Sequence, residues 1–314
     1  MSLTFIPFTE GETHLDWHQL TDALAHGHTL PKAEIADSFL YRQPDTLLSR
    51  SAWIDGMGIA VKAATIFPDN TQRHLPRVNG AVSLFSDTTG ELEAMIDFHL
   101  VTKWKTAGDS LLAAKRLARP DSNNILIVGA GTVAWAARSA YGAAFPNAQF
   151  TVWNRSRPAA DKLASAFPGM RVSDDLEQAV RGADIITSAT MSETPLLRGQ
   201  WLQPGQHIDL IGAYRPNMRE ADDAALQRAS VFVDSFDTTV GHIGEIKIPL
   251  ESGAITRAHL QADFYQLDRF QRTSDQAITL FKNGGGAHLD LMTSRYILLA
   301  WRAGTHTASG SVWG

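Results

Sequence analysis

Short apolar runs alternate with stretches of helical spacing through the middle of the chain. The run Asn124–Val128 leads into two closely spaced glycines, and helical spacing follows from about Thr132 to Ala144. Further short apolar runs, with one more helical stretch at 157–167, occur at 149–153, 183–188, 207–212 and 230–234. Strands that alternate with helices in this way form parallel β-α-β units. The pattern therefore predicts an α/β fold with a doubly wound parallel sheet of the Rossmann type.

The segments on either side have a different pattern. Residues 15–25 have helical spacing, whereas residues 46–66 and 81–85 have the composition of strands broken by turn residues. From about Leu92 the spacing predicts a helix that continues to Leu117 and ends before a proline. The last segment, from about Asp275, is predicted to be helical with a glycine break, and we expect it to fold back onto the N-terminal part.

The composition excludes several classes of protein. The chain has no cysteine, which rules out disulfides, thiolate nucleophiles and cysteine-based metal sites. Its net charge of −5, without a basic stripe, argues against nucleic-acid binding. It has no apolar run near the roughly 20 residues of a membrane helix. The histidines lack metal-ligand spacing, so we predict no metal site. The absence of cysteine fits a cytoplasmic protein, which we expect.

The glycine turn after the first apolar run has the pattern G-x-G-x-x-A. In a strand–turn–helix context, the first glycine permits the turn and the second lets the backbone approach a pyrophosphate. The helix N-terminus then offers free N–H groups to the anion. A plain turn without ligand is the alternative. The residues that we expect to bind a dinucleotide here are Gly129, Ala130, Gly131, Thr132 and Val133.

The end of the second apolar run indicates which dinucleotide is bound. An NAD site usually has an acidic residue about 20 residues beyond the glycine turn, to bind the ribose 2′-hydroxyl. Here the chain has Asn154, Arg155 and Ser156, followed by Arg157, and no acid. Because a guanidinium can hold a 2′-phosphate in a bidentate manner, we predict NADPH, with NADH as the alternative.

Two further segments are candidates for cofactor contacts. Ala189 and Thr190 follow the third apolar run, where Rossmann domains meet their cofactor. Gly284 and Gly285 could bring backbone close to the nicotinamide, although a helix cap or a flexible turn explains them equally well.

Five segments, in this order, resemble the ornithine cyclodeaminase/mu-crystallin family. They are residues 61–70, 102–110, the glycine turn, 211–220 with 233–235, and 279–286. The resemblance implies an α+β substrate-binding and dimerisation domain, formed by residues 1–113 with 288–314. It implies a Rossmann NAD(P)-binding domain at 114–287, a homodimer, and hydride exchange between a nicotinamide and a C=N bond next to a carboxylate.

The resemblance also supplies candidate substrate-binding residues. Lys62 matches the family's carboxylate-binding lysine, and Lys105 stands where the family usually has an arginine. Lysine offers a point charge instead of a planar fork, so this exchange is not conservative. A further family arginine has no clear match, and Arg42 and Arg50 are candidates for its place.

One departure separates the branches of the family. Cyclodeaminases have a catalytic aspartate where this chain has Tyr214, and a phenol is a poor general base at neutral pH. The chain is therefore similar to the ketimine reductases, which also lack that acid. We expect an NADPH-dependent reductase of a small cyclic imine 2-carboxylate, such as Δ1-pyrroline-2-carboxylate, in which Lys62 and Lys105 serve as catalytic residues that hold the substrate. The alternatives are an NAD-dependent ornithine cyclodeaminase and an NADPH-binding, crystallin-like protein.

Overall fold

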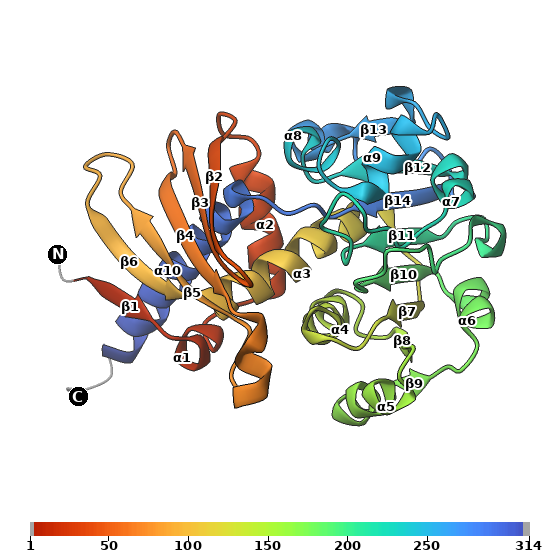
Figure 1. The fold of residues 1–314 in the computed structure, drawn as a ribbon, viewed down its shortest axis with the longest axis horizontal. Helices are drawn as coiled ribbons and strands as arrows, with labels where there is room; N and C mark the ends of the chain where they lie inside the picture. The colour runs from red at the N-terminus through yellow and green to blue at the C-terminus, as the bar shows by residue number, and fades with distance from the viewer. Residues whose placement is uncertain (1–2, 310–314) are drawn as a thin grey trace. The chain divides into compact units, whose positions relative to one another are not determined.

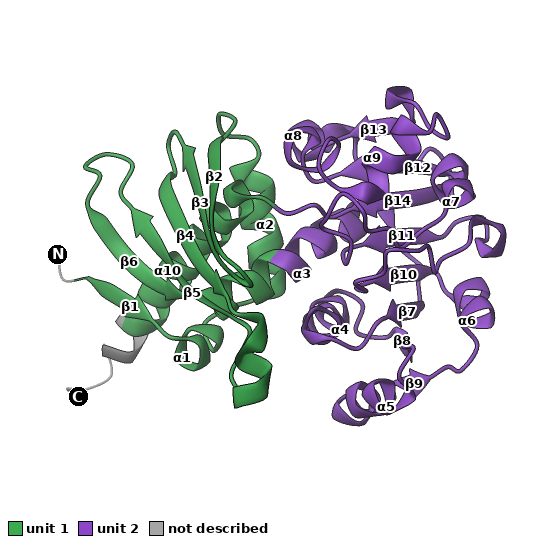
Figure 2. Ribbon diagram, viewed as in Figure 1, with its two compact units in different colours: residues 1–105, 286–314 green, residues 106–285 purple. Residues whose placement is uncertain are grey.

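The computed structural model describes residues 3–309 and divides into two compact units (Figures 1 and 2). The first unit comprises Met1–Lys105 with Gly286–Gly314, and the second comprises Thr106–Gly285. The division falls inside helix α3 (Phe98–Leu117). Among the described residues, no helix is long and apolar enough to cross a membrane.

Within the described residues, the first unit holds a six-stranded sheet in the order β1-β6-β5-β4-β3-β2. Its strands are β1 (Thr4–Ile6), β2 (Glu34–Arg42), β3 (Asp45–Ile54), β4 (Gly58–Ile66), β5 (Val78–Phe85) and β6 (Leu92–Asp97). Its helices are α1 (Phe8–Glu12), α2 (Trp17–Gly27), the 3₁₀ helix η1 (Pro68–Arg73) and α10 (Ala287–Ser309).

Helix α10 packs against one face of this sheet, over β3, β4 and β5 (Figure 1). The side chains on that face are mostly small or aliphatic and buried, as period-2 alternation requires, because successive strand residues point to opposite faces. Ala52, Ala60, Leu84 and Ala94 lie side by side across four strands and are all buried. Helix α10 therefore contributes to the core of the first unit.

The second unit is a Rossmann-type parallel sheet in the order β13-β12-β14-β11-β10-β7-β8-β9. The strands are β7 (Asn124–Val128), β8 (Gln149–Trp153), β9 (Arg171–Val172), β10 (Ile185–Ser188), β11 (His207–Leu210), β12 (Ala229–Val233), β13 (Leu260–Ala262) and β14 (Ile278–Lys282). The helices are α4 (Thr132–Ala144), α5 (Arg157–Ala166), α6 (Leu176–Gly182), α7 (Asp223–Arg228), α8 (Phe236–Thr239) and α9 (Gly244–Glu251), with the 3₁₀ turns η2 (Gly199–Trp201), η3 (Arg257–His259) and η4 (Phe264–Arg269).

The direction of winding reverses between β7 and β10. From β7 the chain continues to β8 and β9 on one side, and it returns to β10 and β11 on the other. The crevice at the carboxyl ends of two such strands is where open α/β sheets bind ligands. The glycine turn follows β7, and Ala189 and Thr190 follow β10, so both segments lie at this switch point.

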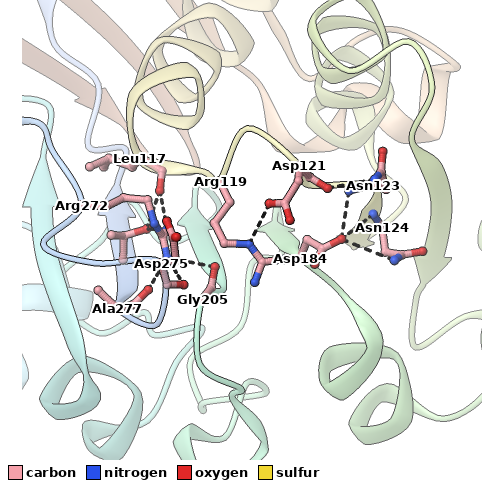
Figure 3. Close-up of polar contacts among 11 residues, drawn as sticks. Leu117, Arg119, Asp121, Asn123, Asn124, Asp184, Gly205, Arg272, Asp275 and Ala277 are labelled. Carbon is pink, nitrogen blue, oxygen red and sulfur yellow. Dashed lines mark hydrogen bonds and ion pairs between the residues drawn. The ribbon is translucent and has the colours of Figure 1, made fainter.

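The opposite, amino-terminal edge of the sheet is tied by polar contacts (Figure 3). Arg272 donates to the backbone carbonyls of Leu117, Gly205 and Ala277, which joins the end of α3 to the loops before β11 and β14. Asp184 accepts from Arg119 and from the backbone N–H groups of residues 123 and 124 at the start of β7. These contacts stabilise the scaffold, while the carboxyl edge holds the candidate ligand site.

Two predicted helices begin too early in the chain. Residues 92–97 form strand β6, and helix α3 begins only at Phe98. Residues 278–282 form strand β14, which lies between β11 and β12 in the middle of the second sheet. Both segments are short, and a short apolar run fits a buried strand as well as a piece of helix.

Candidate active site

The glycine turn has the geometry that a dinucleotide requires. Gly129 has φ +112°, and a Cβ there would lie 2.8 Å from the carbonyl oxygen of Ala189. Gly131 has an ordinary extended backbone, and a Cβ there would meet no protein atom within 4 Å. Ala134 is fully buried. The fold itself therefore requires the first glycine, whereas the second keeps open space beside the N-terminus of α4, where no side chain caps the helix.

The loop after β8 holds two arginines in different surroundings. Arg157 forms ion pairs with Asp161, at 2.8 Å, and with Asp174. Arg155 is exposed and makes no ion pair within residues 3–309. The amide of Asn154 donates to the carbonyl of Ser156 and shapes the loop. Of the residues predicted to bind the 2′-phosphate, Arg155 is thus the cation that remains available.

A buried carboxylate organises the neighbouring loops. Glu220 accepts hydrogen bonds from the Ser188 hydroxyl at 2.6 Å, the Thr190 N–H at 2.8 Å and the Gly212 N–H at 2.6 Å. The backbones that leave β10 and β11 are therefore held by one side chain. Because the Thr190 hydroxyl also donates to Glu220, both of the Thr190 donors are engaged, and the residue can offer a cofactor only acceptor oxygens and its methyl group.

Glu220 is itself fixed by a second acid and lies in a charged cluster. Its backbone N–H donates to Glu245, whose pKa is raised to about 7 by burial and by the charge of Glu220. Lys282 is fully buried and donates to the carbonyls of Leu210 and Asn283, and burial lowers its pKa. This cluster stabilises the carboxyl edge of the sheet rather than presenting charge to solvent.

The glycines at 284 and 285 are explained largely by the fold. Their N–H groups donate to Asp234 at 3.0 and 2.6 Å. A Cβ at Gly284 would lie 2.1 Å from the Thr239 hydroxyl, and Gly285 has φ +69°. Because these N–H groups are engaged within the protein, any cofactor contact would come from other backbone atoms.

The first unit contains a buried group of two lysines and one acid. The Oδ1 atom of Asp290 lies 3.0 Å from the Nζ atom of Lys62 and 3.0 Å from that of Lys105. Lys62 also donates to the Thr102 hydroxyl at 3.0 Å. The three charged residues come from β4, α3 and α10 and are all buried. The structure thus unites the two predicted lysines and adds an acid that the sequence analysis missed.

The charges of this group shift one another. Burial lowers the pKa of Lys62 to about 8, and Asp290 partly offsets that shift. Burial opposes ionisation of Asp290, yet the two ammonium groups outweigh it and lower the pKa of its carboxyl to about 2. Asp290 is therefore a carboxylate at neutral pH, and Lys62 titrates within the physiological range.

The two candidate arginines lie at different positions along the strands of the first sheet. Arg50 is directly opposite Lys62 in the β3–β4 register and binds Asp37 through two nitrogens. Arg42 lies at the β2–β3 hairpin, pairs with Asp45, and has a side chain that is 79% exposed. The structure brings Arg50 beside the lysines and leaves Arg42 about five strand positions, roughly 17 Å, away.

The buried histidines do not form a metal site with acids. His28 and His288 lie edge to face with ring centroids 5.6 Å apart, and burial lowers the pKa of both. Among the described residues, no three histidine, aspartate or glutamate side chains gather in a group that could hold a metal ion.

Comparisons with known proteins show the family of the chain. Residues 52–305 match the ornithine cyclodeaminase/mu-crystallin family model. The Δ1-pyrroline-2-carboxylate reductase of Paracoccus denitrificans is 48% identical, over 93% of this chain and 95% of the relative. The chain therefore belongs to the ornithine cyclodeaminase/mu-crystallin family.

Two solved structures share the whole fold. The Δ1-pyrroline-2-carboxylate reductase of Thermococcus litoralis, in complex with NADH and L-proline, has a TM-score of 0.88 and 23% identity, over 96% of this chain and 98% of the other. An archaeal alanine dehydrogenase, described as a dimer with bound NAD, has a TM-score of 0.88 and 25% identity, over 97% and 98%.

Proposed function

We propose that this chain is a nicotinamide-dependent reductase of a small cyclic imine 2-carboxylate of the Δ1-pyrroline-2-carboxylate type. The observation that carries the proposal is the buried Lys62–Lys105 pair, in a chain 48% identical to a Δ1-pyrroline-2-carboxylate reductase. Asp290 balances only one of the two buried ammonium charges, and the second is expensive to maintain without an anionic ligand, because burial disfavours charge. The substrate carboxylate is the anion that would balance it.

The residues of the first unit would bind and orient the substrate. The ammonium groups of Lys62 and Lys105 would donate to the substrate carboxylate and fix the adjacent C=N carbon. The bound cofactor supplies the hydride to that carbon. The imine nitrogen must gain a proton, and Lys62, with a pKa of about 8, is the candidate to hold it.

The second unit would bind the dinucleotide, and Arg155 favours NADPH. The residues fit the group, since Gly131 leaves space for a pyrophosphate and the first turn of α4 has no side-chain cap. No acid occupies the loop after β8, and Arg155 is exposed there. A guanidinium binds the 2′-phosphate of NADPH, whereas NADH offers only a hydroxyl.

The first unit would also form the interface of a homodimer. Strand β2 is an edge strand whose nine residues are all exposed, and large apolar side chains cluster on it and on β3. Leu40 is 67% and Tyr41 66% exposed. A long exposed apolar edge is a hazard for aggregation unless another chain covers it, and the archaeal relative of the same fold is described as a dimer.

The direct test is oxidation of NADPH and of NADH, followed by loss of the reduced nicotinamide absorbance, with Δ1-pyrroline-2-carboxylate and Δ1-piperideine-2-carboxylate. We expect turnover of at least one imine, faster with NADPH. Parallel reactions contain L-ornithine with NAD⁺ for a cyclodeaminase, and a 2-keto acid with ammonia for an amino-acid dehydrogenase. Ammonia release from ornithine, or cofactor binding without turnover of either imine, would overturn the proposal.

A further inference from the structure

The surroundings of Asp290 differ from those of Glu220 and Asp234, two buried acids of the second unit. Glu220 and Asp234 each accept backbone N–H groups and so hold loops together. The side chain of Asp290 contacts the two lysines, both through Oδ1, and within residues 3–309 its buried Oδ2 atom has no hydrogen-bond partner. A buried acceptor without a partner is uncommon and calls for an explanation. In the described part of the chain, Asp290 binds no loop backbone through its side chain, so stabilising a loop does not explain its burial.

We propose that Asp290 is a positioning residue that holds the ammonium groups of Lys62 and Lys105 side by side, so that both can bind one substrate carboxylate. This inference rests on the proposed function. One oxygen atom, 3.0 Å from each nitrogen, defines the separation of the two cations. Because the three residues come from three different elements, removing the acid leaves two like charges to repel each other within the core.

The same contact keeps Lys62 charged. Burial and the charge of Lys105 both lower the pKa of Lys62, and Asp290 raises it. Without the acid, Lys62 would lose its proton at a lower pH, and a neutral amine cannot provide charge for a carboxylate. Asp290 thus acts on the substrate through the lysine.

The other groups around the lysines cannot replace Asp290. Arg50, on β3, adds positive charge, and its guanidinium is bound by Asp37 of β2. His288, on α10, is neutral because burial lowers its pKa well below the usual value. From α3, Thr102 contributes an uncharged hydroxyl and Phe98 a ring whose centroid lies 4.6 Å from the Lys62 Nζ atom. Asp290 is therefore the carboxylate that this part of the described chain places against both lysines.

The test compares Asp290→Asn with two other variants. Asp290→Glu keeps the charge and moves it by one methylene group. Glu93→Gln is the matched control, because Glu93 on β6 pairs with Arg295 and Arg302, which lie on the same helix α10 as Asp290. The first measurement is the pH dependence of kcat/KM for the imine, together with the dissociation constant of NADPH.

In the wild type, kcat/KM should fall as pH rises through the pKa of Lys62, about 8. In Asp290→Asn this limb should move down by about one pH unit or more. For a one-unit shift from a pKa of about 8, KM should rise about twofold at pH 7 and about tenfold at pH 9, where the charged fraction of Lys62 falls tenfold for each pKa unit. NADPH affinity should stay unchanged. Asp290→Glu should retain the wild-type limb, and Glu93→Gln should match the wild type in both quantities.

A second measurement separates this inference from the proposed function. In protein with ¹³C-labelled lysine side chains, the Lys62 signal, assigned with Lys62→Arg, gives its pKa by NMR without turnover. A lower Lys62 pKa in Asp290→Asn supports the positioning role even if the wild type reduces no imine. An unchanged Lys62 pKa and pH limb in folded Asp290→Asn would overturn it. If that variant does not fold, an Asp290→Glu protein with the wild-type limb but a raised KM supports the role, because the longer side chain keeps the charge and displaces the two ammonium groups. An Asp290→Glu protein with wild-type KM overturns it.

Discussion

Arg155 and Arg157, which follow β8, have different electrostatic surroundings, and their substitution should therefore have different effects on cofactor binding. Arg155 is exposed, whereas Arg157 is held by two carboxylates. Arg155→Ala should raise the dissociation constant of NADPH about 10- to 100-fold, the effect of losing a charge-assisted bidentate contact. The affinity for NADH should change less than about twofold, because a 2′-hydroxyl does not need the charge. Fluorescence titration with both cofactors measures the two constants.

Arg157→Ala is the control for that titration. Its guanidinium is already neutralised by Asp161 and Asp174, so its removal should change both affinities by similar small factors. If the two variants behave alike, or if Arg155→Ala weakens NADH as much as NADPH, the 2′-phosphate is not bound by Arg155.

At the scale of single residues, the sequence predicted the two lysines as site residues but not their arrangement around Asp290. Lys62 and Lys105 came from family-like segments, while Asp290 was missed because it lies in a helix predicted only by its spacing. Its one local signal is an acid between the buried Leu289 and Leu291. The choice between Arg42 and Arg50 needed the β3–β4 register, which depends on pairing that no single segment encodes.

The strand–turn–helix element that begins the second unit gives a pair of matched variants. Gly129→Ala should lower the unfolding temperature by several degrees, since it places a Cβ at φ +112° and 2.8 Å from the Ala189 oxygen. Gly131→Ala should leave that temperature almost unchanged, because its Cβ meets no protein atom. It should nevertheless weaken NADPH binding by about tenfold or more, because the Cβ occupies the approach of the pyrophosphate.

Thermal unfolding and NADPH titration of both variants check this separation of roles. A Gly131→Ala protein that binds NADPH like the wild type would show that no phosphate approaches this turn. An equally large loss of stability in both variants would mean that the two glycines serve the fold alone.

Elements were predictable where local pattern and tertiary environment agreed. The strands before the glycine turn and at 149–153, 185–188 and 207–210 matched because their apolar runs are short and bounded by turns. The strand at 278–282 was mistaken because a short buried apolar run fits a strand as well as a piece of helix, and this run shortly precedes the helical spacing of α10. Residues 92–97 were merged with α3 because β6 passes into the helix without an intervening loop.

On the scale of the whole molecule, the remaining prediction concerns the exposed edge of the first sheet. Strand β2 extends to the β2–β3 hairpin, and Phe39, Leu40 and Tyr41 are among its exposed apolar residues. Exposed apolar surface of this kind contributes to association when a second copy covers it, by about 25 cal/mol for each Å² buried. We therefore expect light scattering to give the mass of a dimer at micromolar concentration.

The variant Leu40→Asp tests which surface forms that dimer. A carboxylate in place of a side chain buried by association loses apolar contact and must be desolvated, so the dimer dissociation constant should rise about 100-fold or more. Leu299→Asp is the control, because Leu299 is 56% exposed on α10, outside β2 and β3. A wild type that stays monomeric up to high micromolar concentration contradicts the dimer itself. A dimer that Leu299→Asp disrupts and Leu40→Asp does not would place the interface away from β2, and the exposed apolar edge would then need a different partner.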